Sequence, residues 1–337
     1  MRAAVIRGAG NINVEEWPEP EPGPAEIKVK VAYCGLCGTD PEILEGRFGL
    51  ITTKMSDEPR IIGHEASGTI AAVGKNIKNY EVGQRVACNF RSPCGACYYC
   101  RNKMEHFCRR THHSSGAYAE YAVYNEQAVY ALPDDISLEI GALLEPVSVA
   151  VHATDVANIY PGSSVAISGA GTIGLLCLEL ALKSGAARVL ISEPVAGKRQ
   201  LAKKLGADVV VDPLQEDIVE IGKKLTDGRG FDTVIEASGS LDAAKQALSL
   251  IDCCGTILWA AVYPRDAEVG VPPSYMYSKE LTIRAIFTSP YSFPRALNLL
   301  PKLELEPLIT HIIPLDEIKK VFEIHKTGKS IKILVKP

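Results

Sequence analysis

The sequence has little that would direct it to a membrane or to nucleic acid. Its 337 residues carry a formal net charge of −4, so no basic surplus attracts phosphates or anionic lipids. No apolar run approaches the roughly 20 residues that span a bilayer, since Glu179 and Lys183 interrupt the best candidate. The apolar stretch at the amino terminus is too short for a secretory signal. We therefore expect a cytoplasmic protein with no membrane or nucleic-acid partner.

The ten cysteines are also not distributed as in a disulfide-rich secreted domain. Seven of them fall between Cys34 and Cys108. Without a secretion signal, this clustering indicates metal ligands in a reducing compartment. The cysteines outside the metal motifs described below are expected to be small buried apolar side chains: Cys34, Cys88, Cys177, Cys253 and Cys254.

Length and periodicity predict two domains of different architecture. A chain of 337 residues with 47% hydrophobic content is large enough for two cores. The first part reads as strands, for example residues 26–32 (EIKVKVA), which alternate with strict period two. After Gly162, strands alternate with helical segments of about 10–15 residues, which indicates a parallel, doubly wound sheet. The expected fold class is α/β, a β-rich part followed by a Rossmann-type sheet with strands at 165–167, 188–192, 208–211, 233–237, 256–261 and 281–287.

A glycine-rich turn stands at the start of this second part. An apolar strand leads into Gly169-Ala-Gly171-Thr172-Ile173-Gly174, and a helix, a second strand and the acid Glu193 follow. A bare GxGxxG occurs by chance as an ordinary turn, but here its flanks are those of a dinucleotide site. The glycines allow the tight turn, the approach of a pyrophosphate and close helix packing, while the helix start offers amides to the phosphates.

Glu193 indicates which dinucleotide is bound. An acid after the second strand binds the adenosine ribose diol and repels a 2′-phosphate, which favours NAD. Lys198 and Arg199 lie nearby and keep NADP open as the alternative.

Four cysteines form a compact metal motif, Cys94-x-x-Cys97-x-x-Cys100-x7-Cys108. Four thiolates in one short loop suit a closed, tetrahedral structural zinc. An iron–sulfur site is the main alternative, although the x3-Cys-Pro continuation of bacterial ferredoxins is absent. Free structural thiols are the remaining interpretation.

A second, looser set consists of Cys37, His64, Glu65 and Glu145. Each residue alone has an ordinary structural explanation: a buried thiol, a core histidine, or an acid at a helix start. Beside a nucleotide fold, they suggest an open zinc site with thiolate, imidazole and carboxylate ligands and one exchangeable position.

At these residues the sequence resembles the zinc-containing medium-chain dehydrogenases, which include alcohol, sorbitol and threonine dehydrogenases. The likeness covers essentially the whole chain and rests on Cys37-Gly-Thr39-Asp40, Gly63-His-Glu-x-x-Gly68, the four-cysteine loop, Glu145-Pro146 and the glycine turn. It implies a GroES-like catalytic domain of residues 1–152, to which residues 288–337 return, and a Rossmann domain of residues 153–287.

The resemblance also implies a catalytic zinc on Cys37, His64 and either Glu65 or Glu145. The segment LEPVSVAVHA (residues 144–153) looks like the polyol and threonine branch, where a glutamate replaces a cysteine ligand. Zinc would lower the pKa of a bound secondary alcohol, Thr39 would accept its proton, and hydride would pass to the nicotinamide. Glu42 stands where relatives usually carry a relay histidine, so either Glu42 takes that role or protons leave through solvent.

Further contacts follow from the same resemblance. Ile173 is expected near the pyrophosphate, and the expected contacts with the nicotinamide half are Ala237, Ser238, Ala260, Ala261, Val262, Ile286 and Phe287. Lys198 aligns with a basic residue beside the adenine ribose. The candidates for the substrate pocket are Thr39, Glu42, Arg47, Phe48, Glu145 and Thr288. Relatives are usually dimers or tetramers, so a homodimer or homotetramer is expected.

The implied activity is reversible, zinc-dependent oxidation of a secondary alcohol in a polyol or sugar derivative, with NAD or NADP as acceptor. Oxidation of an amino alcohol in the manner of L-threonine 3-dehydrogenase is the nearest alternative, and the missing relay histidine counts mildly against it. A zinc- and nucleotide-binding relative without turnover is a third interpretation. It is disfavoured because Cys37, Thr39, His64 and Glu145 are all present.

Overall fold

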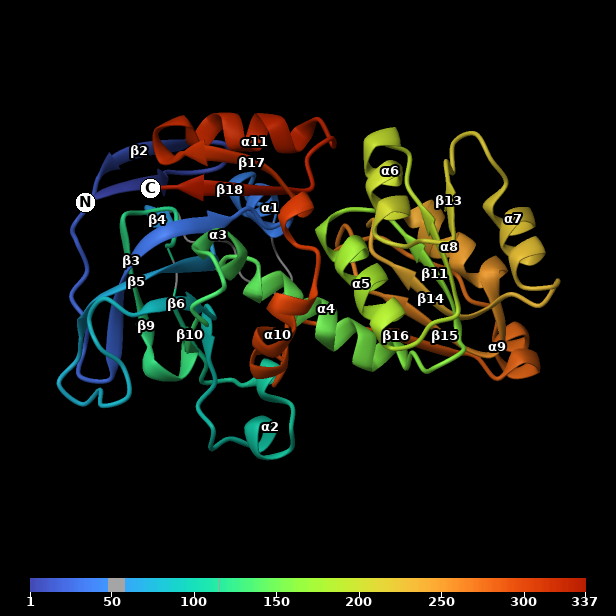
Figure 1. Cartoon of the computed structure of the whole chain (residues 1–337), viewed down its shortest axis with the longest axis horizontal. Helices are drawn as coiled ribbons and strands as arrows, with labels where there is room; N and C mark the ends of the chain where they lie inside the picture. The colour runs from blue at the N-terminus through green and yellow to red at the C-terminus, as the bar shows by residue number, and fades with distance from the viewer. Residues whose placement is uncertain (48–57, 115) are drawn as a thin grey trace. The chain divides into compact units, whose positions relative to one another are not determined.

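The computed structural model describes residues 1–47, 58–114 and 116–337 (Figure 1). The chain divides into two compact units, the first made of residues 1–148 and 290–337 and the second of residues 149–289. The boundaries expected from the sequence were 152/153 and 287/288. No helix among the described residues is long and apolar enough to cross a membrane.

The first unit is built on antiparallel β-structure. Its largest sheet has seven strands in the order β10-β6-β5-β3-β18-β17, with β9 also paired to β3. Strands β1, β2 and β4 form a second sheet, and β7 and β8 a small hairpin. The strands contributed by residues 1–148 are β1 (Arg2–Ile6), β2 (Ile12–Glu16), β3 (Glu26–Gly35), β4 (Arg60–Ile61), β5 (Glu65–Val73), β6 (Arg85–Cys88), β7 (Arg91–Ser92), β8 (His112–His113), β9 (Tyr121–Asn125) and β10 (Val129–Ala131).

Short helices connect these strands. They are α1 (Thr39–Leu44), α2 (Tyr98–Arg101) and α3 (Leu138–Gly141), with single 3₁₀ turns at Glu105–Phe107 and Glu126–Ala128. Helix α4 (Leu144–Ala157) is longer and carries the chain across the boundary between the two units.

The carboxy-terminal segment completes the first unit. Its strand β18 (Lys332–Lys336) pairs antiparallel with β3, with Leu334 opposite Gly35, and parallel with β17 (Ile309–Pro314). The segment also contains α10 (Phe293–Leu299), α11 (Ile318–Lys326) and 3₁₀ turns at Leu300–Lys302, Glu306–Leu308 and Leu315–Glu317. Ile318, Val321 and Phe322 of α11 belong to the same apolar core as β3. This pairing brings β18 next to the residues that follow β3.

The second unit is a six-stranded, fully parallel sheet in the order β13-β12-β11-β14-β15-β16. With the β-rich first unit, this sheet confirms the predicted fold class. The strands are β11 (Ser164–Ser168), β12 (Arg188–Ser192), β13 (Val209–Val211), β14 (Phe231–Glu236), β15 (Ile251–Trp259) and β16 (Thr282–Ala285). The helices are α5 (Thr172–Lys183), α6 (Ala196–Lys204), α7 (Ile218–Leu225), α8 (Leu241–Leu250) and α9 (Pro273–Lys279).

Some elements were not expected from the sequence. Strand β2 is largely half-buried and β17 has mixed burial, so neither shows a clean alternation. Helix α9 has no fully buried residue, so its sequence lacks the apolar periodicity that would have predicted a helix. The expectation that Cys253 and Cys254 are buried is wrong. Both are exposed, because β15 has an irregular start at which Cys254 adopts a positive φ of 58°.

Candidate functional site

The four-cysteine loop brings all its thiols together. The Sγ atoms of Cys94, Cys97, Cys100 and Cys108 lie within 4.8 Å of one another, and those of Cys97 and Cys100 are 3.5 Å apart. A tetrahedron with Zn–S bonds of about 2.3 Å needs S···S separations of about 3.8 Å. The observed spacing therefore fits a zinc ion bound by four thiolates.

Backbone amides prepare this loop for thiolates. The N–H groups of Cys94 and Arg110 both donate to Sγ of Cys108, at 3.4 Å each. Burial acts to raise the pKa of Cys108, but these amides and the Thr111 hydroxyl lower it to about 6. A lowered pKa of this kind suits a thiol to bind a metal.

The second metal set is assembled from separate parts of the first unit. Cys37 follows β3, His64 precedes β5, and Glu65 is the first residue of β5. Ligand atoms of these three residues lie within 4.8 Å of one another. Sequence positions far apart thus supply a thiolate, an imidazole and a carboxylate at one point.

Asp40 orients two of these ligands, a role not assigned to it from the sequence. Its Oδ2 accepts from the backbone N–H of Cys37 at 3.0 Å and from the hydroxyl of Tyr118 at 2.6 Å. Its Oδ1 is buried without a hydrogen bond and lies 3.6 Å from Nδ1 of His64. Burial acts to lower the pKa of His64, yet Cys37 and Asp40 raise it well above its ordinary value. A carboxylate facing Nδ1 leaves Nε2 for the metal.

Lys332 is the second functional residue that sequence reasoning missed. Its Nζ donates to both carboxylate oxygens of Glu65, at 2.8 and 2.6 Å, and to the carbonyl of Leu36 at 2.8 Å. Lys332 and Glu65 are each only 2% exposed. Gly35 is required here, because a Cβ at this position would clash with the Glu65 carboxylate. Only the pairing of β18 with β3 reveals this lysine.

Glu145 is buried close to this group without a recorded hydrogen bond to its carboxylate from any described residue, and it is 6% exposed. Burial raises its pKa to about 7, against the opposing effect of His64 and with a further contribution from Glu65. Cys37, Glu65 and Glu145 thus bring a thiol and two carboxyl groups to one buried place beside the imidazole of His64. These are groups that bind zinc.

The remaining catalytic candidates lie on α1. Thr39 begins this helix and is half-buried. Glu42 accepts from Nε and Nη2 of Arg47, at 3.1 and 3.0 Å, and this pairing lowers the pKa of Glu42. A lowered pKa makes Glu42 a weaker proton acceptor. Phe48 lies outside the described residues, and Thr288 belongs to the second unit.

The glycine turn has the local geometry of a phosphate loop. It joins β11 to α5, and a Cβ at Gly174 would clash with the carbonyl of Gly169. At Gly171, by contrast, a Cβ would meet nothing within 4 Å, so the backbone is open to a ligand. Thr172 and Ile173 begin the helix, and the positive end of a helix dipole attracts phosphate.

Glu193, at the end of β12, is turned toward the same loop. Its Oε2 accepts from the N–H of Ala170 and its Oε1 from that of Val195, both at 2.9 Å. Arg199 donates to the carbonyl of Glu193 at 2.7 Å and pairs with Asp212 at 3.1 Å. Burial lowers the pKa of Lys198. Arg199, which lies near the expected ribose, is thus already bound to groups of the protein itself.

The other expected cofactor contacts all lie in the second unit, in the segments that follow its parallel strands. Ala237 and Ser238 follow β14, whereas Ala260, Ala261 and Val262 follow β15. Ile286 and Phe287 follow β16. Ligands of parallel α/β sheets bind at this carboxyl edge.

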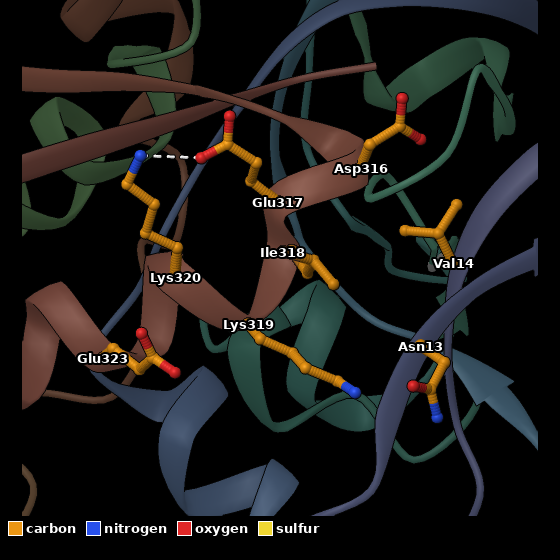
Figure 2. Close-up of a pocket in the computed structure, with 8 residues that line it drawn as sticks. All are labelled: Asn13, Val14, Asp316, Glu317, Ile318, Lys319, Lys320 and Glu323. Carbon is orange, nitrogen blue, oxygen red and sulfur yellow. Dashed lines mark hydrogen bonds and ion pairs between the residues drawn. The ribbon is translucent and has the colours of Figure 1, made fainter.

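A surface hollow of about 440 Å³ lies elsewhere in the first unit (Figure 2). The eight residues that line it come from β2, from the 3₁₀ turn Leu315–Glu317 and from α11, and Lys320 pairs with Glu317 at 2.6 Å. None of these eight is a predicted site residue. The hollow is open and offers no ligand set, so it is not a candidate active site.

Comparison with known proteins gives matches over both units. Residues 23–134 match the family model of the alcohol dehydrogenase GroES-like domain, and residues 172–302 match that of the zinc-binding dehydrogenases. L-threonine 3-dehydrogenase of Pyrococcus abyssi is 36% identical over 90% of this chain and 89% of its own length. D-arabitol-phosphate dehydrogenase of Enterococcus avium is 33% identical over 91% of this chain and 88% of its own length.

A solved structure from Sinorhizobium meliloti, named as a zinc-binding dehydrogenase and bound to NADP, has a TM-score of 0.91 with this chain. It is 32% identical, and the match covers 100% of this chain and 99% of that one.

Proposed function

We propose that this chain, which belongs to the zinc-containing medium-chain alcohol dehydrogenase family, oxidises a secondary alcohol of a polyol or sugar derivative to a ketone, reversibly and with NAD. The observation that carries this proposal is the convergence of Cys37, His64 and Glu65 within 4.8 Å, close to the buried carboxylate of Glu145. Bound zinc supplies a Lewis acid that lowers the pKa of an alcohol.

For the third ligand of the catalytic zinc, we favour Glu145 over Glu65. Both oxygens of Glu65 accept from Lys332, so Glu65 would have to give up a buried ion pair to bind metal. Glu145 is also buried, but no cation among the described residues hydrogen-bonds to its carboxylate. Glu145→Gln should therefore release the catalytic zinc, while Glu65→Gln should retain it with weaker affinity. Zinc content after dialysis separates the two assignments.

We assign to Thr39 the role of accepting the proton of the alcohol. Thr39 begins α1 two residues after Cys37 and is half-buried, and its hydroxyl has no hydrogen bond to any of the described residues. The ion pair with Arg47 makes Glu42 a poor base, and we assign no proton transfer to it. From Thr39 the proton passes to solvent.

NAD is favoured over NADP because of charges near the expected ribose. The carboxylate of Glu193 is buried beside Ala170 of the glycine turn, and each of its oxygens keeps a lone pair for a ribose hydroxyl. Asp212 pairs with Arg199, which reduces the positive charge available to a 2′-phosphate.

The polyol assignment is supported by the polar character of the metal site and by relatives such as D-arabitol-phosphate dehydrogenase. L-Threonine is the second candidate, because the L-threonine 3-dehydrogenase of Pyrococcus abyssi is 36% identical to this chain. The homodimeric or homotetrameric assembly, expected from family resemblance, and the cytoplasmic location, expected from the sequence, remain predictions.

The test is a matrix of polyols, sugar phosphates, aldoses and L-threonine, each with NAD and with NADP, read by absorbance of the reduced cofactor. The proposal expects turnover of a polyol or sugar derivative with NAD. Turnover of threonine alone would replace the substrate assignment. Absence of any turnover in a protein that holds two zinc ions per chain would favour a binding protein.

A further inference from the structure

A buried acid in the second unit has no part in the metal or phosphate chemistry described above. Glu236 is the last residue of β14 and is 0% exposed. Among the described residues, the groups that donate to its carboxylate are backbone amides and hydroxyls, with no cation among them. Keeping a carboxylate buried in this way is costly unless several donors are fixed around it.

The first group of donors follows Glu236 directly in the chain. Oε1 of Glu236 accepts from the backbone N–H of Ser238 at 2.7 Å and also from the Ser238 hydroxyl. The N–H of Gly239 approaches both carboxylate oxygens at 3.2 Å. The Ser238 hydroxyl oxygen in turn accepts from the N–H of Ser240, the N-cap of α8. The carboxylate therefore fixes the turn between β14 and α8.

The remaining donor comes from the neighbouring strand. The hydroxyl of Tyr263, four residues after the end of β15, donates to Oε2 of Glu236. The main chain repeats this link, since the N–H of Ala260 donates to the carbonyl of Glu236 at 2.8 Å. Burial, together with Glu236, raises the pKa of Tyr263 well above its ordinary value, so the phenol keeps its proton as a donor.

These two segments also adjoin each other and the phosphate loop. A Cβ at Gly239 would lie 3.3 Å from the carbonyl of Val262, and a Cβ at Gly169 would lie 3.0 Å from Ser238. Both glycines have positive φ, 77° and 95°, so a side chain at either position would be strained as well as crowded. Glu236 thus stands where the ends of β11, β14 and β15 meet.

We infer that Glu236 is a positioning residue for the cofactor: with Tyr263 as its link, it holds residues 238–239 and 260–263 in the one arrangement that accepts the nicotinamide half. This inference rests on the proposed function, because those segments are cofactor contacts only if a dinucleotide binds at the carboxyl edge of this sheet. Glu236 acts through the backbone of its neighbours and is not itself a catalytic residue.

Two substitutions separate the parts of this arrangement. Tyr263→Phe removes the link between the segments and keeps the carboxylate. Glu236→Gln keeps the volume and one acceptor oxygen but removes the charge that attracts all the donors. Matched controls are Tyr277→Phe and Glu268→Gln, since Tyr277 is 88% exposed on α9 and Glu268 is exposed in the segment that precedes it.

The first measurement is amide hydrogen exchange in the cofactor-free protein. Both Tyr263→Phe and Glu236→Gln should exchange faster in residues 237–240 and 260–264, by about tenfold, with the rest of the sheet unchanged. The second is the Kd of NAD and of NADH, measured by protein fluorescence. It should rise about three- to tenfold for Tyr263→Phe and more for Glu236→Gln.

Because bound cofactor restores the arrangement, KM for NAD should rise with Kd while kcat at saturating NAD changes less than about twofold. Exchange and Kd that match those of the two controls would overturn the inference. Faster exchange with an unchanged Kd would overturn the cofactor role. If the unaltered protein binds no NAD or NADH, the proposed function fails, and the exchange data show this separately because they need no cofactor.

Discussion

The two candidate metal sites of the first unit differ in how they are built. The four-cysteine loop takes all its ligands from residues 94–108, and its thiols are held by amides of the same loop. The group around Cys37 takes its ligands from the end of β3, from β5 and from the start of α4. It also depends on Asp40 and on Lys332. Lys332 lies 267 positions after its partner Glu65 in the chain.

This difference shows where each group gets its specificity. A contiguous loop folds around its metal, so the bound ion takes the place of an apolar core. The residues of the dispersed site are brought together by strand pairing, and burying their charges requires opposite charges nearby. The Lys332–Glu65 pair provides part of that balance. The following substitutions test this contrast.

Cys37→Ser should have the largest effect. Loss of the thiolate removes the catalytic metal, and kcat/KM should fall by about 10³-fold or more because the Lewis acid is lost. The four-cysteine loop shares no residue with this site, so zinc content should fall from two ions per chain to one, with an unchanged circular dichroism spectrum. Cys253→Ser, at an exposed cysteine of the second unit, is the control. Retained activity in Cys37→Ser would contradict the assignment of Cys37 as a ligand of the catalytic metal.

Lys332→Met should affect stability first. It leaves the Glu65 carboxylate buried without its cation, which should lower the free energy of unfolding by about 3–5 kcal/mol. The double variant Glu65→Gln, Lys332→Met should regain most of this loss, since neither charge is then buried alone. Denaturant unfolding measures both, with Lys75→Met, at an exposed lysine, as the control. A single variant as stable as the control would show that the ion pair is not needed for the fold.

Cys100→Ser should remove the other zinc and leave the catalytic one in place. Binding to the folded state alone stabilises a protein by about 2.7 kcal/mol when free ligand is 100 times its Kd, so the variant should lose stability of this order. Its kcat at low temperature should stay within about twofold of the unaltered protein. Metal analysis and thermal unfolding check both statements. Iron with visible absorbance in the unaltered protein would instead indicate a cluster.

The same contrast explains what the sequence could reveal. The cysteine loop and the glycine turn are local motifs, so their spacing alone predicted the grouping of Cys94, Cys97, Cys100 and Cys108 and the strand–turn–helix around Gly171. The parallel sheet followed from regular alternation of strands and helices. The two motifs depend on residues that are close in the chain, and the sheet was predicted from a local pattern that repeats along it.

Lys332 and Glu236 could not be found in this way. Lys332 stands in the segment KSIKILV, where a lysine between apolar residues is expected to face solvent. Only the pairing of β18 with β3 places it against Glu65. Glu236 reads as the polar end of an apolar strand, and its link to Tyr263 depends on the register of β14 and β15. Cys253 and Cys254 were misplaced because the irregular start of β15 exposes them. Long-range pairing and local backbone irregularity leave no simple pattern in one sequence.

The smallest expected effect concerns cofactor choice and extends the comparison to a charge pair outside both metal sites. Asp212→Asn frees Arg199 from its 3.1 Å partner, and the guanidinium can then attract a 2′-phosphate. Because partly exposed pairs contribute up to about 1 kcal/mol, the ratio of kcat/KM for NADP to that for NAD should rise about two- to fivefold. Asp227→Asn, which breaks the exposed pair with Arg188 in the same unit, should leave the ratio unchanged. Equal ratios in the two variants would mean that Glu193 alone sets the preference for NAD.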